Sequence, residues 1–390
     1  MTTAHSIPDG FPRGQTAIVA AATFGVGEMP GYSTFDLAAR ASVAALSQVG
    51  LRPRDVDGLF TVVMDDTLSG LSFAEYLGAR TRFNDNCRTG GSSFQIQASI
   101  AALALASGQC DVALIAYGSN QRSSAGKLVG STRPSPWESP YHPLRPISAY
   151  ALAAARHMYE FGTTREQLGE VAIAARKWAQ LNPQAVMRAE LTMEEYLAAR
   201  MVSDPLCLRD CCLVTDGAAA VVMVRTDRAR ELCARAAYLL GAAHETTHRE
   251  IVNMPSLTTT GLKPAAERAF AQARLAPRDV DVVELYDAFT INTILFLEDL
   301  GFCAKGEGGR FVSGGRIAPG GELPVNTNGG GLSFCHPGMY GLFTMVEAAQ
   351  QIMGVCGARQ VPNVDVAIAQ GNGGELSSEA VLVLGAPSTL

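Results

Sequence analysis

One loop in the first half of the chain combines a cysteine with closely spaced glycines. Residues 84–93 contain Cys87 and, just after it, Gly90, Gly91 and Ser92. The apolar, alanine-rich stretch that follows is typical of a buried helix, so the loop is expected at the positive end of a helix dipole, beside free backbone N–H groups. Such a setting lowers the pKa of a thiol or stabilises an oxyanion. An ordinary tight turn is the alternative interpretation.

Three loops of the second half supply partners for this chemistry. Tyr286 and Asp287 end a strand-like run, Asn326 opens a glycine-rich segment that leads to His336, and Gly373 lies in the glycine-rich end of the last long strand. Active sites of α/β proteins assemble in loops that follow strands. The catalytic candidates are Cys87, Tyr286, Asp287 and His336. The candidates for binding substrate oxygens are Gly90, Gly91, Ser92, Asn326 and Gly373.

Two other groups of residues imitate metal sites. His244 and His248 have the spacing of a zinc-protease motif, but the apolar run before them is typical of a strand, and two adjacent threonines disfavour the required helix. Cys207, Cys211 and Cys212 lack the spacing of a zinc ribbon, and no histidine near them completes four ligands. We expect a strand-to-loop segment, buried reduced thiols and no metal site.

The elements that position the candidate loops are repeated along the chain. Three segments of the first half have similar counterparts in the second half, in the same order. The pairs are residues 51–57 with 275–281, 91–94 with 331–334, and 111–115 with 365–369. Three matches in one order indicate a duplicated unit.

Short apolar runs alternate with helical patterns in both copies, which predicts βαβ units and an α/β fold. Residues 121–203 have no counterpart, and they are first rich in proline and then helical. We expect an N-terminal half formed by residues 1–120 and 204–235, an inserted loop domain over residues 121–203, and a C-terminal half over residues 236–390. An insertion of this kind commonly carries substrate contacts.

The composition excludes several classes of protein. The 390 residues are 47% hydrophobic and 17% charged, which suits a packed core and excludes a disordered chain. The net charge of −6 provides no basic surface for nucleic acid. No apolar run approaches the ~20 residues that span a bilayer, and residues 1–14 lack the pattern of a signal peptide. A cytoplasmic protein that binds neither nucleic acid nor membrane is expected.

Several segments together resemble the thiolase superfamily, most closely the sterol-carrier-protein-x type thiolases and the thiolase-like lipid-transfer proteins. The segments that carry the resemblance are residues 90–118, 204–220, 286–289, 326–338 and 370–374. The resemblance implies a duplicated α/β fold with five α-β-α-β-α layers and an inserted loop domain. It also implies acyl-CoA substrates, no cofactor besides the CoA of the substrate, and at least a homodimer.

The chain departs from the thiolase pattern at the cysteines. In the sterol-carrier type, a His-Asp-Cys-Phe motif holds a cysteine that transfers a proton, and the matching residues here are Tyr286, Asp287, Ala288 and Phe289. The other family position for this cysteine carries Gln370. No second catalytic thiol is evident.

The position of the family's nucleophile admits two alignments. The local sequence Asn-Cys-x-Thr-Gly resembles the nucleophile loop and selects Cys87. Counting back from Gly108 over the usual length of the central helix selects Gly91 instead. An extra helical turn in a close-packed layer is harder to accommodate than a drifted loop. We therefore favour Gly91, which leaves Cys87 near the pocket but not aimed at the thioester carbonyl.

The departures distinguish two reactions. Thiolytic cleavage of a β-ketoacyl-CoA needs a thiolate that accepts the acyl group. Retro-aldol cleavage of a β-hydroxyacyl-CoA instead needs a base, stabilisation of the thioester enolate and an acid. Tyr286 and His336 can share the base and acid roles. The resemblance extends to thiolase-like aldol lyases that cleave steroid side chains, which carry a tyrosine at the position of Tyr286 and, as aligned, a second one at that of His336.

The sequence therefore predicts an enzyme that makes or breaks a carbon–carbon bond β to a CoA thioester, with retro-aldol cleavage favoured. A Cys87-dependent thiolase, or acetyl-CoA acyltransferase, and a non-catalytic acyl-CoA or lipid-binding subunit stay as alternatives. The polar pair Tyr286-Asp287 and the retained His336 argue against mere binding. In the steroid-cleaving subgroup a small OB-fold, zinc-ribbon acyl-CoA-binding protein commonly completes the enzyme, so such a partner is a further expectation.

Overall fold

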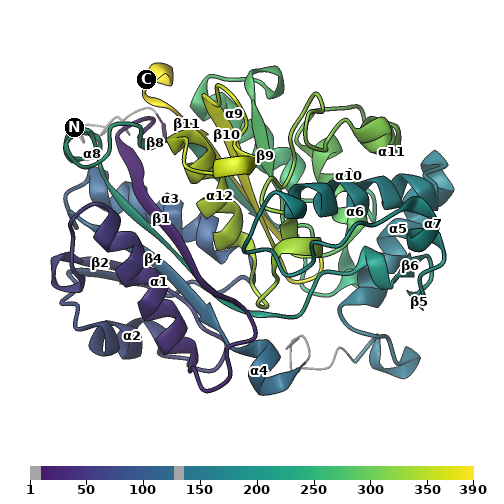
Figure 1. Ribbon diagram of the computed structural model, residues 1–390, viewed down its shortest axis with the longest axis horizontal. Coiled ribbons are helices and arrows are strands. Elements are labelled where there is room, and N and C mark those ends of the chain that lie inside the picture. Colours follow the sequence, from purple (N-terminus) through teal and green to yellow (C-terminus); the bar gives the residue numbers. More distant parts are fainter. Residues whose placement is uncertain (1–9, 127–135) are drawn as a thin grey trace, which may run out of the picture.

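A computed structural model describes residues 10–126 and 136–390 of the chain. Its centre is a nine-stranded sheet in the order β3-β2-β4-β7-β1-β8-β11-β10-β9, with helices packed on it (Figure 1). The strands are β1 (Thr16–Gly27), β2 (Gly58–Thr61), β3 (Phe83–Asp85), β4 (Ala113–Ser119), β5 (Met201–Ser203), β6 (Leu206–Cys207), β7 (Asp216–Arg225), β8 (Ala237–Thr246), β9 (Val282–Glu284), β10 (Val366–Gly373) and β11 (Ser378–Gly385). The α-helices are α1 (Thr34–Gln48), α2 (Ser69–Leu77), α3 (Ser93–Ala106), α4 (Gln121–Ala125), α5 (Ile147–Phe161), α6 (Arg165–Gln180), α7 (Met193–Leu197), α8 (Thr226–Leu232), α9 (Leu262–Ala273), α10 (Thr290–Asp299), α11 (Gly308–Val312) and α12 (Gly341–Met353).

The sheet consists of two halves with one pairing pattern. In the first half β2 and β4 are parallel, and β4, β7 and β1 continue antiparallel. In the second half β9 and β10 are parallel, and β10, β11 and β8 continue antiparallel. The halves join where Ala17 and Ile18 of β1 pair with Tyr238 and Ala237 of β8. The duplicated α/β fold predicted from the sequence is confirmed.

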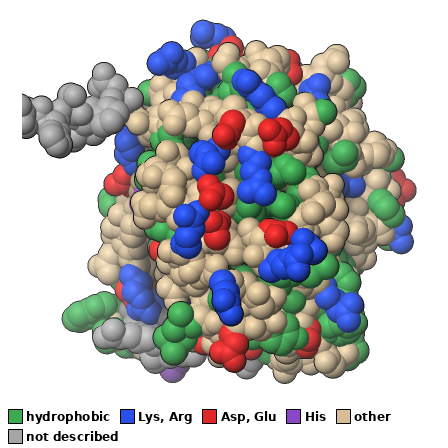
Figure 2. Space-filling model, turned by 90° about the vertical axis from the view of Figure 1, so that its left-hand side faces the viewer, with side chains coloured by type: hydrophobic (Ala, Val, Ile, Leu, Met, Phe, Trp, Pro, Cys, Tyr) green, Lys and Arg blue, Asp and Glu red, His purple; other side chains and the backbone are tan. Residues whose placement is uncertain are grey.

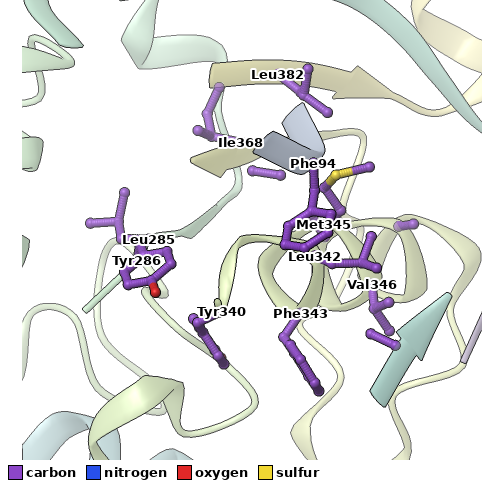
Figure 3. Close-up of a cluster of buried hydrophobic side chains, with 14 of the residues drawn as sticks. Phe94, Leu285, Tyr286, Tyr340, Leu342, Phe343, Met345, Val346, Ile368 and Leu382 are labelled. Carbon is purple, nitrogen blue, oxygen red and sulfur yellow. The ribbon is translucent and has the colours of Figure 1, made fainter. Parts of the chain in front are cut away.

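Helices α3 and α12 form the central layer, because each contacts strands of both halves and the two helices contact each other. Helix α1 packs on β1, β4 and β7, and α9 packs on β8 and β11. Figure 3 shows the core next to the central helices, where Phe94 of α3 and Met345 of α12 lie beside Ile368 and Leu382 of the C-terminal strands. The alanine-rich, evenly hydrophobic sequence of α3 suits a helix that is covered on every side.

Two of the three sequence repeats occupy equivalent places. The first pair forms a short 3₁₀ turn, η1 (Pro53–Asp55) or η5 (Pro277–Asp279), just before β2 or β9. Next to it, the carboxylate of Asp57 accepts hydrogen bonds of 2.9 and 2.8 Å from two backbone N–H groups at the start of β4. The carboxylate of Asp281 does the same at the start of β10, with distances of 2.8 and 2.9 Å. The shared aspartate thus ties neighbouring parallel strands together in each half.

The remaining repeat does not mark equivalent positions. Residues 91–94 lead into α3, whereas residues 331–334 lie in a π-helical turn, η7 (Gly330–Phe334). The second central helix, α12, begins later, at Gly341. The similarity of these two segments therefore reflects their glycine content rather than the duplication.

Residues between β4 and β7 carry helices α4 to α7, and this insertion contacts the C-terminal half. The Asn182 side chain donates a hydrogen bond of 2.9 Å to the carbonyl oxygen of Asn328, and Met187 N–H donates one of 3.0 Å to that of Ser333. The insertion therefore holds the turn η7. Residues 127–135 of the expected loop domain and the first nine residues of the N-terminal half lie outside the described residues. The division into domains stays a prediction.

The surface agrees with the charge balance of the sequence. Figure 2 shows Lys and Arg side chains interspersed with Asp and Glu on one face, rather than gathered into a patch of one sign. Within residues 10–126 and 136–390, no helix combines the length and the hydrophobicity needed to cross a bilayer. The cytoplasmic location stays a prediction.

Candidate active site

The site lies at the start of the central helix α3. Gly91 immediately precedes Ser92, the N-cap residue of this helix, and both are buried. In the described part of the chain, no acceptor takes a hydrogen bond from the N–H group of Gly91. A free N–H group at the positive end of a helix suits a negatively charged oxygen. The structure thus places Gly91 where the alignment by helix length predicts it.

Tyr286 and His336 meet beside this helix end. Tyr286 follows β9, and His336 follows the turn η7. The Tyr286 hydroxyl oxygen lies 3.0 Å from His336 Nε2 and 3.2 Å from the carbonyl oxygen of Gly338. The hydroxyl has two acceptors for its one proton, and the ring nitrogen donates or accepts according to the tautomer. The two side chains can therefore pass a proton in either direction.

The N-terminal half fixes the backbone around His336. The N–H group of His336 donates to Thr215 Oγ1 at 3.1 Å, and Thr215 N–H donates back to the carbonyl oxygen of His336 at 3.3 Å. The Tyr117 hydroxyl of β4 donates to the carbonyl oxygen of Pro337 at 2.5 Å. The site therefore depends on both halves of the fold.

The ring of Tyr286 lies against Gly91. A Cβ atom built on residue 91 would be 2.7 Å from Tyr286 Cζ and 2.7 Å from the carbonyl oxygen of Asn372. Both separations are far below the 3.5–4.0 Å of ordinary van der Waals contact. While Tyr286 keeps this place, residue 91 has to be glycine.

Burial sets the protonation of the pair. The His336 side chain is 3% exposed, and burial lowers its pKa to about 4. Burial also raises the pKa of Tyr286 well above its ordinary value. At neutral pH the histidine is uncharged and the tyrosine keeps its proton. Before the reaction the pair is therefore uncharged and not an ion pair.

Tyr340 packs on both members of the pair. Its ring lies nearly parallel to that of His336, with centroids 6.1 Å apart, and edge-on to that of Tyr286, with centroids 5.9 Å apart. Figure 3 shows Tyr286 and Tyr340 side by side at the margin of the core. The Tyr340 hydroxyl donates to Asn328 Oδ1 at 2.8 Å, which fixes the ring.

Asp287 supports the loops and does not touch the hydroxyl of Tyr286. Its Oδ1 accepts a hydrogen bond of 2.6 Å from Gly331 N–H of the turn η7. Oδ2 is buried with no partner among the described residues. Burial raises the pKa of Asp287 to about 7, although hydrogen bonds from Gly331 and Asn326 oppose the shift. The carboxyl group therefore holds the turn η7 next to Tyr286, and its catalytic role stays a prediction.

Cys87 lies in the loop before α3, half-buried, and has none of the contacts of an activated thiol. Its N–H group donates to Asp85 Oδ1 at 2.9 Å. Burial and the nearby Asp85 charge both raise the pKa of the thiol. In the described residues no hydrogen bond connects Cys87 with His336. Within the described residues Cys87 thus shares no hydrogen bond with the other catalytic candidates.

Gly90, Ser92 and Gly373 pack on one another. A Cβ atom on Gly90, which has a φ of +89°, would lie 2.8 Å from Gly373 Cα. The Ser92 hydroxyl bonds to Thr89 Oγ1 at 2.9 Å and to Ser378 Oγ at 3.0 Å. These contacts occupy the Ser92 hydroxyl, and the contact of Ser92 with a substrate oxygen stays a prediction. The glycines allow the loop before α3 to approach the end of β10.

Comparison with known proteins bears on this arrangement. A family model described as "Thiolase C-terminal domain-like" matches residues 243–386. An acetyl-CoA acetyltransferase of Methanothermobacter thermautotrophicus is 32% identical over 386 residues, which cover 94% of this chain and 98% of the relative. The chain belongs to the thiolase superfamily. It is therefore an enzyme of the thiolase-like kind, a carbon–carbon lyase or an acyltransferase.

Two further matches are named as aldolases. A steroid side-chain-cleaving aldolase of Thermomonospora curvata is 33% identical over 394 residues, covering 94% of this chain and 98% of the relative. A solved structure described as an Ltp2-ChsH2(DUF35) aldolase matches with a TM-score of 0.88 and 31% identity, covering 96% of this chain and 98% of that chain. The superfamily predicted from the sequence is confirmed.

Asn326 lies next to the loop that carries Tyr286. Its Oδ1 accepts a hydrogen bond of 2.6 Å from Leu285 N–H, just before Tyr286. Its backbone has a φ of +53°, a conformation that asparagine tolerates better than most residues. The side chain therefore holds the loop of Tyr286, and its contact with a substrate oxygen stays a prediction.

Two residues next to the pair are not among the candidates from the sequence. Tyr340 stands four residues after His336, and nothing in its spacing indicates that its ring reaches back to the histidine. Gln370 appears in the sequence only as the residue that replaces a thiolase cysteine, yet its side chain bonds to the backbone of Tyr286. Both contacts depend on tertiary packing.

The structure shows where the residues of the two groups that imitate metal sites lie. His244 lies in strand β8, and His248 lies in the loop after it, so the pair is not on one helical face. Cys207 and Cys212 are buried, Cys211 is half-buried, and all three thiols are free. Among the described residues, no group of three or more His, Cys, Asp or Glu side chains is arranged to bind a metal ion.

Proposed function

We propose that this enzyme cleaves a β-hydroxyacyl-CoA by a retro-aldol reaction, giving a carbonyl compound and a shortened acyl-CoA without an acyl-enzyme. One observation carries the proposal: Tyr286, hydrogen-bonded to His336 at 3.0 Å, occupies the space that a side chain on residue 91 would need. A proton relay therefore stands where a thiolase would place its nucleophile.

The reaction needs only one proton to be moved. Tyr286 accepts the proton of the substrate β-hydroxyl while its own proton passes to His336, and the new carbonyl forms as the Cα–Cβ bond breaks. The electron pair of that bond passes into the thioester as an enolate, whose oxygen the free N–H of Gly91 stabilises. The relay then returns the proton to Cα. The proton leaves the hydroxyl and ends on carbon, so no oxidant or co-reactant is required.

The electrostatics of the pair support this role. A histidine with a pKa of about 4 is uncharged at neutral pH, so its ring nitrogen is available to Tyr286, although burial makes it a weak base. A phenolate is disfavoured at Tyr286 because burial raises its pKa, so transfer to His336 has to accompany transfer from the substrate. The Gly338 carbonyl provides a second acceptor that keeps the hydroxyl in place.

The relatives support the reaction class and the substrate class. One is named as a steroid side-chain-cleaving aldolase, and the names of the superfamily members include acetyl-CoA acetyltransferase. An acyl-CoA substrate suits both. We propose a bulky acyl group, steroid or aromatic, with the CoA thioester carbonyl directed at Gly91.

A Cys87-dependent acyltransferase is the second candidate, and the acetyltransferase relative favours it. The position of Cys87 argues against it, because the thiol lies in the loop, beside Asp85, with a raised pKa. A non-catalytic binding subunit is disfavoured by the buried Tyr286–His336 pair, since an apolar pair would fill the same space without the cost of burying polar groups.

The enzyme is proposed to act as a homodimer together with a small acyl-CoA-binding chain of OB-fold and zinc-ribbon type. The name of the Ltp2-ChsH2(DUF35) aldolase, which has two components, supports such a partner. The chain should be assayed alone and with a candidate partner on β-hydroxyacyl-CoA and β-ketoacyl-CoA esters. Cleavage of the hydroxy ester without added CoA supports the proposal, and CoA-dependent cleavage of the keto ester alone overturns it.

A further inference from the structure

The side chain of Gln370 is directed at the catalytic loop although it is fully buried. Gln370 Oε1 accepts a hydrogen bond of 2.9 Å from the backbone N–H of Tyr286. Gln370 Nε2 donates one of 2.7 Å to Glu379 Oε2 on the neighbouring strand β11. Glu379, Gln370 and Tyr286 thus form one chain of hydrogen bonds.

We infer that Gln370 is a positioning residue for Tyr286 and that Glu379 holds Gln370 in the required orientation. The inference deepens the proposed retro-aldol function and rests on it for its effect on the reaction rate. Position 370, which carries a cysteine in some thiolases, here carries a glutamine that binds the backbone N–H of Tyr286.

The orientation of the amide follows from its neighbours. A backbone N–H can only donate, so Gln370 has to present its oxygen to Tyr286. The amide nitrogen then faces Glu379, which accepts through Oε2. A side chain without an acceptor at position 370 would leave the buried N–H of Tyr286 unpaired, and one without a donor would lose the bond to Glu379.

The backbone of Tyr286 is held at both ends of the residue. Its N–H is bound by Gln370, and its carbonyl oxygen accepts a hydrogen bond of 3.2 Å from Asn292 Nδ2. The ring has no room to move toward Gly91. A backbone shift therefore moves the hydroxyl relative to His336, and small displacements of reacting groups reduce rates strongly.

Glu379 suits the role of a neutral acceptor. It is fully buried, burial raises its pKa, and the Asp299 charge of α10 acts in the same direction. Tyr150 of α5 also faces it, and Glu245 of β8 is its direct partner across the strands. Among the described residues, no ion pair includes Glu379.

The experiment compares two substitutions of Gln370. Gln370→Met keeps the length of the side chain but has no strong acceptor for the Tyr286 N–H. We expect kcat for the hydroxy ester to fall at least tenfold while KM changes less than threefold. Gln272→Met is the matched control, because Gln272 Oε1 accepts the Ala242 N–H at 2.8 Å on the outer helix α9. Its kcat should stay within twofold of the wild-type value.

The second substitution, Gln370→Glu, is followed by the pH dependence of kcat, which would not change if Gln370 had a purely structural role. Its carboxylate still accepts the Tyr286 N–H, but it faces Glu379 across a 2.7 Å contact, so the two carboxyl groups have to share a proton. We expect kcat within threefold of wild type at pH 6 and a decline of tenfold or more by pH 9 relative to wild type. The same pH profile in wild type and Gln370→Glu would overturn the inference.

A second measurement does not depend on activity. 3-Fluorotyrosine at position 286 reports the ring environment by ¹⁹F NMR in the folded protein. The signal should shift in Gln370→Met and stay in place in Gln272→Met. An unchanged signal together with an unchanged kcat overturns the positioning role. If wild type does not cleave the hydroxy ester, the proposed function fails, and the ¹⁹F signals still decide whether Gln370 positions Tyr286.

Discussion

The ring of Tyr286 occupies the space that a side chain on residue 91 would need. A Cβ atom on residue 91 would lie 2.7 Å from Tyr286 Cζ, so only one of the two positions can carry a side chain. In the same place the Tyr286 hydroxyl reaches His336 Nε2 at 3.0 Å. The place of the Tyr286 ring beside His336 and the absence of a side chain on residue 91 therefore depend on each other.

Replacing Gly91 with alanine tests this packing. Gly91→Ala should push the Tyr286 ring away from His336 and lower kcat/KM on a β-hydroxyacyl-CoA by about 100-fold, in line with the cost of misplacing reacting groups. Steady-state kinetics on the purified variant measures the effect. Gly217→Ala is the matched control, because a Cβ there meets its nearest atom, Pro337 Cγ, at an ordinary 3.4 Å. Equal activities of the two variants would contradict the packing argument.

Removing only the hydroxyl of Tyr286 tests the relay. Tyr286→Phe keeps the ring against Gly91 but removes the group that exchanges a proton with the substrate. We expect kcat to fall by about 10²–10⁴, the usual contribution of acid–base catalysis, with little change in thermal stability. Tyr238→Phe, at another buried tyrosine in strand β8, should keep wild-type kinetics. Retention of more than a tenth of the activity in Tyr286→Phe would exclude the relay.

The charge of His336 can be followed directly. Because burial lowers its pKa to about 4, the ring should stay neutral from pH 8 down to pH 5. NMR titration of its ring signals, assigned with His336→Gln, measures this pKa. A midpoint near the ordinary 6.5 would mean that the ring is solvated and charged at mildly acidic pH, contrary to the buried geometry.

Asp287 makes the stability depend on pH. Its pKa is about 7 in the folded protein against 3.8 in an unfolded chain, so between these values only the folded state holds the proton. This contribution is complete below about pH 4 and is lost as pH rises to 7, and it amounts to ~4 kcal/mol. Asp287→Asn keeps an acceptor for Gly331 N–H and removes the titration. The free energy of unfolding of wild type relative to Asp287→Asn should therefore fall between pH 4 and 7. A constant difference would contradict the raised pKa.

Much of the fold is readable from the sequence because its signals are local. The repeats that contain Asp57 and Asp281 place the same turn and the same strand-bridging carboxylate in each half. The apolar, alanine-rich run after Gly91 predicts the central helix for the same reason. The repeat at residues 331–334 misleads because glycine-rich segments look alike whether they open a helix or form the turn η7.

The site is only partly readable, because its decisive contacts connect residues far apart in the chain. Tyr286 and His336 are identifiable from their loops, and the sequence places Gly91 at the helix start. The contact of the Tyr286 ring with Gly91, and the bond from its N–H to Gln370, arise only when both halves are folded. For the same reason the sequence does not show that the Ser92 hydroxyl bonds to Ser378, or that the Asn326 side-chain oxygen accepts from the backbone of Leu285.

The role of Cys87 decides between the two chemistries most directly. The measurement is the cleavage of a β-hydroxyacyl-CoA by Cys87→Ala, without added CoA, with the carbonyl product and the shortened acyl-CoA both quantified. The relay predicts equal amounts of the two products at no less than half the wild-type rate, with no thioester on the protein by mass spectrometry. Loss of cleavage in Cys87→Ala, together with an acyl group trapped on Cys87 in the wild-type protein, would contradict it.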